Sequence, residues 1–286
     1  MKTVGEFTDD AARQRFLTAY RTAMDLLWPS PVVPERVTTS FGEAVAYRTG
    51  AGDGVPLVLV PGSAGSALAW YRYAAALGRK HPIIALDPIG EPGQSTQTRP
   101  IRDAGDVAAD LEETLAALGV QRAHLVGMSY GGWAILRHEL RFPGRAASLT
   151  LLDPAGFGRL GAKFWIWLVA GSLAGLTPGP IRRRLSYPVR NATLRDDNLM
   201  PLLPLVMRFR RRLPIPDQVT DTELAALTVP TLVLMGEHSS LYEPAEVMRR
   251  LRRVLPSAQA EIVPGASHDL PSHSPELVAD RIAGFV

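Results

Sequence analysis

Short apolar runs that end at glycine or proline recur through most of this 286-residue chain. Six of them occupy residues 56–62, 82–88, 123–128, 147–154, 231–237 and 260–266. Helical patterns lie between most of these runs, at residues 66–79, 103–118, 130–141, 243–255 and 274–285. Nearly continuous apolar strands that alternate with helices are typical of a parallel sheet covered on both faces. The chain is therefore expected to have an α/β fold with a mostly parallel sheet.

The first fifty residues follow a different pattern. Residues 8–28 begin with a Thr/Asp cap and keep apolar residues near helical spacing, so we expect a helix that Pro29 stops. Two short β-prone pieces then flank Gly42 and Glu43, and they indicate a hairpin.

The strand–helix alternation stops between Asp153 and Thr231. The residues between them are rich in Trp, Leu, Arg and Pro and show no clear strand pattern. Because so long a structureless loop is improbable inside a compact domain, we expect a helical insertion after the sixth strand. Ligands of open parallel sheets bind at the carboxyl ends of strands, so this insertion is a candidate cap or lid. The expected division is a core of residues 1–153 and 231–286 with a cap of residues 154–230.

The sequence Gly127-Met128-Ser129-Tyr130-Gly131 is a G-x-S-x-G motif with an apolar strand before it and a helical pattern after it. This context is typical of a nucleophile elbow, a strained strand-to-helix turn that exposes a serine hydroxyl at the helix N-terminus. Ser129 is therefore the candidate nucleophile. A chance motif in a glycine-bearing turn would lack the strand and the helix on the correct sides.

A serine hydroxyl needs a base within hydrogen-bond reach before it can act as a nucleophile at neutral pH. His268 follows the last apolar strand on a glycine-containing loop, so it is expected at the same sheet edge as Ser129. His273 is the weaker rival. We expect structural roles for three other histidines, which lie inside or beside predicted elements: His81, His124 and His138.

The chain resembles α/β-hydrolase-fold proteins of the carboxylesterase type, and bacterial hydrolases are similar to it over nearly the whole length. The matching pieces are the Trp-Pro at 28, VTTSFGEAVAYRTG, PLVLVPG with the following Trp70-Tyr71, ALDPIGEPGQS, LVGMSYGGW and GASH. The resemblance implies an oxyanion hole made by the backbone amides of Ser63 and Tyr130. It also implies a structural role for Asp87. Pro61 stands where family members usually carry histidine. Because the expected donors are main-chain amides, this difference leaves them in place.

The acid partner of the histidine is not where the resemblance would place it, because Ser239 occupies the usual position. Asp153 ends the strand after the elbow helix, and some lipases of this fold use an acid there. Glu237 is close to the usual position but is more typical of a local cap, and Glu243 fits the first turn of the next helix. A site without an acid also stays open. We take Asp153 as the candidate.

The composition excludes several classes of protein. The chain has no cysteine, so disulfides, thiol nucleophiles and thiolate metal sites are excluded, and no metal or cofactor is expected. Arginine clusters at 182–184, 208–212 and 249–253 lack interleaved aromatics, so we expect solvated helix faces and no nucleic-acid partner. Acidic residues near the N-terminus argue against a signal peptide and favour the cytoplasm. No oligomeric state is favoured.

The apolar sequence FWIWLVAGSLAGL at residues 164–176 is about 13 residues long, short of the roughly 20 that a membrane span needs. It fits a core helix of the cap or the lining of an apolar substrate pocket. We expect no stable membrane insertion. The leading functional hypothesis is a serine hydrolase that cleaves an ester of an apolar small molecule. A lyase, cyclase or acyl transferase that uses the same Ser/His pair, and a ligand-binding pseudo-enzyme, are the alternatives.

Overall fold

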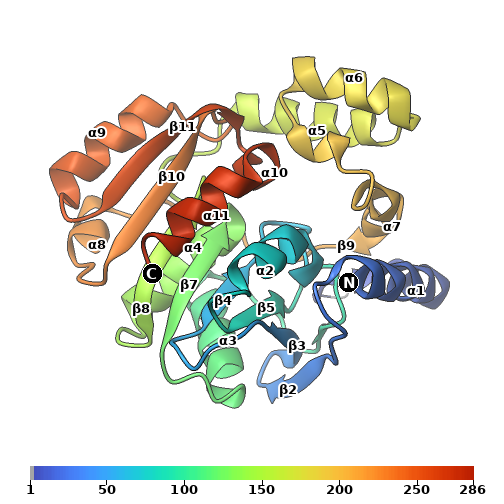
Figure 1. Ribbon diagram of the computed structural model, residues 1–286, viewed down its shortest axis with the longest axis horizontal. Coiled ribbons are helices and arrows are strands. Elements are labelled where there is room, and N and C mark those ends of the chain that lie inside the picture. Colours follow the sequence, from blue (N-terminus) through green and yellow to red (C-terminus); the bar gives the residue numbers. More distant parts are fainter. Residues whose placement is uncertain (1–2) are drawn as a thin grey trace.

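A nine-stranded, mostly parallel sheet forms the centre of the molecule in the computed structural model, which describes residues 3–286 (Figure 1). Its strand order is β11 (Gln259–Ser267), β10 (Thr231–His238), β8 (Ala146–Leu152), β7 (Ala123–Met128), β4 (Leu57–Val60), β5 (Ile83–Asp87), β3 (Gly42–Thr49) and β2 (Glu35–Thr39). The two-residue β6 (Thr96–Gln97) pairs with β3. Pairing is parallel from β11 to β5 and antiparallel around β3, so the expected fold class is confirmed.

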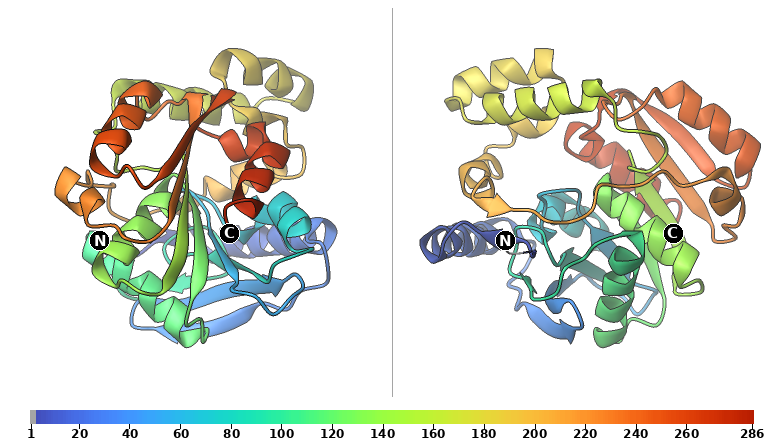
Figure 2. Two further views of the ribbon diagram at one scale, coloured as in Figure 1. Left: turned by 60° about the vertical axis from the view of Figure 1, so that its left-hand side comes forward. Right: turned by 180° about the vertical axis from the view of Figure 1, so that it is seen from behind.

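Helices cover both faces of the sheet because its central strands are apolar on both sides. In β4, Leu57 and Leu59 belong to one apolar cluster while Val58 and Val60 belong to the other. The helices α3 (Ala104–Ala117), α4 (Tyr130–Arg141) and α9 (Pro244–Val254) pack on one face, and α1 (Asp10–Leu27), α2 (Tyr71–Leu77) and α11 (Pro275–Ala283) pack on the other (Figures 1 and 2). Burial on both faces explains the unbroken apolar runs of the sequence.

Three local features differ from the sequence-based expectations. The helix expected over 66–79 begins as a 3₁₀ turn, Ala67–Trp70, before α2. The helix expected over 274–285 is preceded by the separate short helix α10 (Leu270–His273). The hairpin turns at residues 40 and 41, because Thr39 already pairs with Gly42. A Cβ at Gly42 would lie 2.0 Å from the Thr96 carbonyl oxygen, so the neighbouring β6 requires this glycine.

The 154–230 segment is mainly helical and lies largely beyond one end of the sheet. It contains α5 (Ala162–Gly175), α6 (Gly179–Val189), two 3₁₀ turns (Ala192–Arg195 and Met200–Leu202), α7 (Leu203–Val206), β9 (Phe209–Arg210) and α8 (Asp221–Ala225). Figure 2 shows α5 and α6 as a layer of their own, apart from the helices on the sheet faces. No strand is expected here, yet β9 pairs with β1 (Glu6–Phe7), which lies some two hundred residues earlier. A pattern confined to neighbouring residues cannot reveal such a pairing.

The apolar helix α5 is not a core helix. Its buried residues are Gly171, Ala174 and Gly175, near its C-terminal end. Trp165 is 48% exposed and Ile166 is 68% exposed. Among residues 3–286, no helix is both long enough and apolar enough to cross a membrane.

Several of the clustered arginines form specific contacts and are not freely solvated as expected. Arg250 donates to Asp221 at 2.7 Å and to the carbonyl oxygen of Phe157 at 2.9 Å. Arg208 donates to Asp9 at 3.1 Å. These arginines join the 154–230 segment to the core, and the pairing partners are too far away in sequence to be inferred from charge runs.

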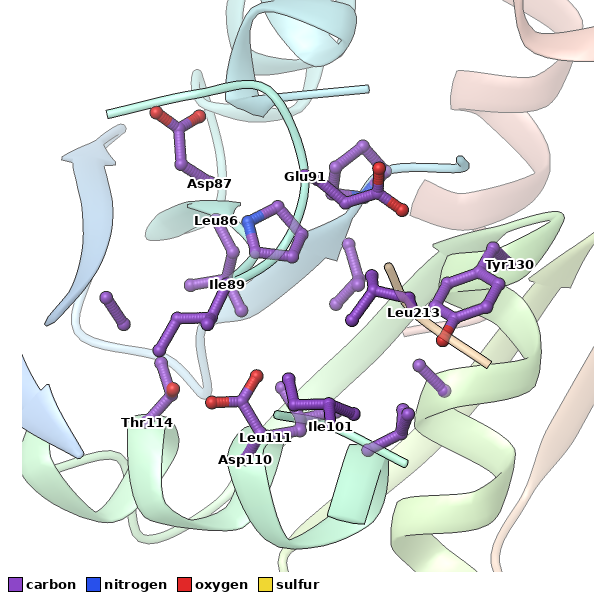
Figure 3. A pocket seen from close by; sticks show the side chains of 16 residues that line it. Leu86, Asp87, Ile89, Glu91, Ile101, Asp110, Leu111, Thr114, Tyr130 and Leu213 are labelled. Carbon is purple, nitrogen blue, oxygen red and sulfur yellow. The ribbon is translucent and has the colours of Figure 1, made fainter. Parts of the chain in front are cut away.

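A cavity of about 40 Å³ lies between the sheet and α3 (Figure 3). Its lining is mostly apolar, with Val60, Leu86, Ile89, Ile101, Leu111 and Leu213 among the lining residues. Asp110 and Tyr130 also face it, and within residues 3–286 Asp110 Oδ1 has no hydrogen-bond partner. Burial raises the pKa of Asp110 to about 8, with a smaller contribution from the charge of Glu113. Asp110 is therefore protonated in the folded protein at neutral pH.

This burial predicts a pH dependence of stability. Between about pH 4 and pH 8 the unfolded Asp110 carboxyl is ionised while the folded one keeps its proton. The unfolding free energy therefore decreases as pH rises, by at most about 1.4 kcal/mol per pH unit from this group, and the decrease ends above the folded pKa. We expect the stability of Asp110→Asn relative to wild type to rise between pH 5 and pH 8 in urea unfolding experiments. The exposed Asp280→Asn should follow wild type. Parallel profiles for Asp110→Asn and wild type would contradict this assignment.

Candidate active site

Ser129 lies in a tight turn between β7 and α4, with φ 51° and ψ −114°. Such a positive φ is costly for a residue with a side chain and persists only where the surrounding structure fixes it. The packing here is close enough to do so. A Cβ at Gly127 would lie 2.5 Å from the Gly131 carbonyl oxygen, and one at Gly131 would lie 2.3 Å from the Val60 carbonyl oxygen. Glycine at both positions lets strand and helix approach closely while the serine is presented between them.

Ser129, His268 and Asp153 form a continuous chain of hydrogen bonds. His268 Nε2 lies 2.9 Å from Ser129 Oγ, and His268 Nδ1 lies 2.6 Å from Asp153 Oδ2. The three residues directly follow β7, β11 and β8, so parallel strands deliver them to one edge of the sheet. Their exposed fractions are 8%, 4% and 0%. The geometry is that of a nucleophile, a base and a group that orients the base.

Ser239 donates a hydrogen bond from its Oγ to Asp153 Oδ2 at 2.9 Å and is fully buried. The same carboxylate oxygen of Asp153 therefore contacts both His268 and Ser239. Ser239 stands at the position where the resemblance places an acid. Asp153 itself has φ 41°, and its amide donates to the Leu234 carbonyl at 2.7 Å. This role of Ser239 is not among the sequence-based predictions. The contact depends on the turn at the end of β10, which continues to His238, beyond Leu234, the partner of the last residue of β8.

The other candidate acids and the rival histidine lie elsewhere. Glu237 is about half exposed and accepts a hydrogen bond from the Gly265 amide at 2.7 Å. Glu243 is the N-cap residue of α9. His273 is exposed, with Nδ1 2.8 Å from the hydroxyl of Ser274.

Three further residues make the contacts expected of structural groups. His124 Nδ1 lies 2.8 Å from the Ser148 hydroxyl. His138 Nε2 lies 2.8 Å from Glu112. The Asp87 carboxylate accepts hydrogen bonds from the Ala67 amide at 2.8 Å and the Gln94 amide at 2.7 Å, so it joins two loops. These contacts leave Asp153 as the carboxylate that reaches His268.

Two backbone amides beside Ser129 are free to donate. A Cβ built on Gly62 would lie 3.3 Å from Ser129 Cβ, so the loop after β4 runs directly past the serine. Ser63 follows Gly62 in that loop, and Tyr130 begins α4 directly after Ser129. Within residues 3–286 neither amide donates a hydrogen bond to another residue. Unpaired amides at a helix N-terminus and in an adjacent loop suit a developing negative charge.

Aromatic side chains of α5 lie against the histidine. The rings of Phe164 and Trp167 approach His268 edge-on, with ring centroids 6.0 and 5.4 Å away. The 154–230 segment therefore contributes apolar surface directly beside the hydrogen-bonded chain.

Hydrogen bonds from Lys163, Thr193 and Arg211 tie the 154–230 segment to the loops around this site. Lys163 Nζ donates to the Ser239 carbonyl at 2.6 Å. The amide of Thr193 donates to Asp269, the residue after His268, at 2.7 Å. Arg211 Nε donates to Glu91 at 2.7 Å. Burial raises the pKa of the Asp269 carboxyl, and its bonds with Thr193 oppose that shift.

The sheet order, the serine turn after a central strand and the histidine after the last strand together define an α/β-hydrolase-fold protein. The chain belongs to the Alpha/beta hydrolase family, which it matches over residues 57–281.

Similar proteins include two from Bacillus subtilis strain 168. Carboxylesterase YbfK is 29% identical, with 95% of this chain and 93% of the relative covered. The uncharacterized carboxylesterase nap is 27% identical, with 99% of this chain and 95% of the relative covered. The crystal structure of carboxylesterase CesB (YbfK) has a TM-score of 0.82 at 27% identity over 96% of this chain and 98% of that one. The crystal structure of a naproxen esterase from Bacillus subtilis has a TM-score of 0.82 at 26% identity, with 95% and 97% covered.

The contact between Asp153 and His268 predicts a clear hierarchy among the carboxylates. Asp153→Asn should lower kcat for p-nitrophenyl butyrate by about 10³- to 10⁴-fold, because the histidine tautomer is no longer fixed and its cation is no longer stabilised. Glu237→Gln, at the turn where the acid is usually found, should stay within about twofold of wild type, since it contacts Gly265 instead. Circular dichroism should show intact folding in both variants. Turnover by Asp153→Asn within a few-fold of wild type would show that the carboxylate has another role.

Proposed function

We propose that this chain is a serine carboxylesterase that acts through an acyl-enzyme. The observation that carries the proposal is the unbroken hydrogen-bond chain from Ser129 through His268 to Asp153 beside two unpaired amides. The resemblance to carboxylesterases over nearly the whole chain supports the same reaction.

In the first half of the reaction, Ser129 Oγ attacks the ester carbonyl carbon while His268 Nε2 accepts the serine proton. The carbonyl π electrons move to its oxygen, and the amides of Ser63 and Tyr130 donate hydrogen bonds to the resulting oxyanion. Collapse of this tetrahedral species breaks the bond to the alkoxy oxygen. His268 gives its proton to the departing alcohol, and the acyl group stays on Ser129.

In the second half, a water molecule attacks the acyl carbon while His268 again accepts a proton. Collapse releases the carboxylic acid and returns the proton to Ser129. Throughout both halves Asp153 accepts a hydrogen bond from the Nδ1–H of His268, which leaves Nε2 to face the serine and stabilises the imidazolium when it forms. Every proton transfer in this scheme uses groups of the chain, the ester or the attacking water.

We further propose that the 154–230 segment is a cap over a core formed by residues 1–153 and 231–286. Support comes from α5, which lies against His268, and from the hydrogen bonds of Lys163, Thr193 and Arg211 to the loops around the site. The rings of Phe164 and Trp167 favour an apolar group near the reacting carbonyl. An ester of an apolar small molecule is therefore the proposed substrate class.

An active-site probe tests the nucleophile. A fluorophosphonate should label wild type in one-to-one stoichiometry, and Ser129→Ala should not react. His268→Ala should react more slowly by about 10²-fold or more, because the base is lost. Ser63→Ala is the matched control and should be labelled normally, since its proposed contribution is a main-chain amide. Labelling of Ser129→Ala at the wild-type rate would overturn the assignment.

The same preparations separate the alternative functions. Labelling of Ser129 without hydrolysis of any simple ester would favour a lyase, cyclase or acyl transferase with the same Ser/His pair. Tight ligand binding with neither labelling nor turnover would favour a pseudo-enzyme.

The position of Trp167 predicts an effect on substrate preference. Trp167→Ala should raise KM for p-nitrophenyl octanoate by roughly tenfold and change KM for the acetate little, because the longer chain loses apolar contact area. Trp165→Ala is the matched control, since Trp165 is on the same helix and makes no ring contact with His268. It should leave both constants near wild type. Equal changes for acetate and octanoate would mean that Trp167 does not contact the acyl chain.

A further inference from the structure

A buried carboxylate accepts a hydrogen bond from the loop that carries Ser63. Glu91, on the loop after β5, is 2% exposed. Its Oε2 accepts a hydrogen bond from the Ala64 amide at 2.9 Å, and its Oε1 accepts one from Arg211 Nε at 2.7 Å. Figure 3 shows Glu91 and Tyr130 among the residues around the cavity near the start of α4. A carboxylate with so little exposure needs such partners, because an unpaired buried charge is strongly destabilising.

Arg211 makes a second contact, with the residue after the nucleophile. Its guanidinium carbon lies 4.3 Å from the centre of the Tyr130 ring. This is a cation–π geometry, and it joins the ring to the Glu91–Arg211 pair. Arg211 therefore touches α4 at its first residue and Glu91 at the same time.

These contacts involve the residue that follows Ser63 and the side chain of Tyr130, so they lie next to both proposed oxyanion donors. Ala64 directly follows Ser63, and its φ of 59° is unusual for a residue with a side chain. The bond from its amide to Glu91 holds that conformation, which fixes the peptide unit next to the Ser63 amide. On the other side, Arg211 packs on the side chain of Tyr130, whose own amide is the second donor.

We infer that Glu91 and Arg211 are positioning residues for the oxyanion hole, one fixing the Ser63 loop through Ala64 and the other bracing Tyr130. The inference rests on the proposed function, because it assigns these residues to the same site. Arg211 belongs to the 154–230 segment, so that segment supports the reaction as well as covering the site. Small displacements of catalytic groups can cost about two orders of magnitude in rate, so the expected effect is on kcat.

The test compares Arg211→Met, Arg211→Lys and Glu91→Gln with wild type. We expect Arg211→Met to lower kcat for p-nitrophenyl butyrate by about 10- to 100-fold with KM changed less than about threefold. Its affinity for a trifluoromethyl ketone, which forms a tetrahedral oxyanion adduct with the serine, should fall by a similar factor. Arg211→Lys keeps the charge and should recover part of both losses. Glu91→Gln keeps an acceptor for the Ala64 amide and should lie between wild type and Arg211→Met.

Arg208→Met is the matched control. Arg208 also joins the 154–230 segment to the core, but its partners are Thr8 and Asp9, which belong to neither the loop after β4 nor the loop after β5. It should leave kcat and inhibitor affinity near wild type. If Arg211→Met does not fold by circular dichroism, Glu91→Gln and Arg211→Lys carry the test.

Two results would overturn the inference. In one, folded variants of Arg211 and Glu91 keep wild-type kcat and inhibitor affinity. In the other, KM rises while kcat is unchanged, which would indicate substrate binding. Wild type that neither hydrolyses esters nor binds the ketone would instead contradict the proposed function. Ser129-dependent turnover in wild type therefore separates the two failures.

Discussion

The close approach of β7 to α4 is the constraint on which the rest of the site depends. Gly127 and Gly131 leave no room for a Cβ between the strand and the helix, so the chain turns sharply and Ser129 takes a backbone conformation that few side-chain-bearing residues adopt. The turn also brings Gly62 against the serine. Because His268 and Asp153 each follow a strand that runs parallel to β7, a serine fixed in this way sets where the histidine and the acid must arrive.

Parallel pairing of β8 with β10 explains why the acid can stand on one strand and the hydroxyl on the next. Leu152 pairs with Leu234, while β10 continues to His238 with a register shift between Gly236 and His238. The Ser239 amide then donates to the Gly236 carbonyl at 3.0 Å, and this turn places Ser239 beside the residue that follows β8. Asp153 and Ser239 meet there on one carboxylate oxygen, the one that faces His268. His268 requires a carboxylate oxygen beside its Nδ1. In this chain the end of β8 supplies the charged group and the end of β10 supplies a small hydroxyl partner.

The sequence predicted the sheet, its covering helices and the three side chains that meet at the edge, because each depends on local periodicity or on a strand end. The roles of those side chains stay predictions. Contacts between distant segments were not predictable. The β1–β9 pair, the hydroxyl of Ser239 on Asp153 and the bond from Arg211 to Glu91 each join segments that are far apart in the sequence. The prediction of solvated arginine faces was wrong for several residues, because a buried carboxylate can bind an arginine that the charge pattern places in solvent.

Surface connections usually tolerate substitutions and changes of length more readily than the elements they join. The 154–230 segment does not have that freedom at Lys163, Thr193 and Arg211, whose partners lie in the loops that carry the site. Between these anchors, exposed residues such as Ile166 can vary at little cost. Diversification toward new substrates would therefore proceed most easily by exchanging stretches between fixed anchor points, and least easily by replacing the segment as a whole.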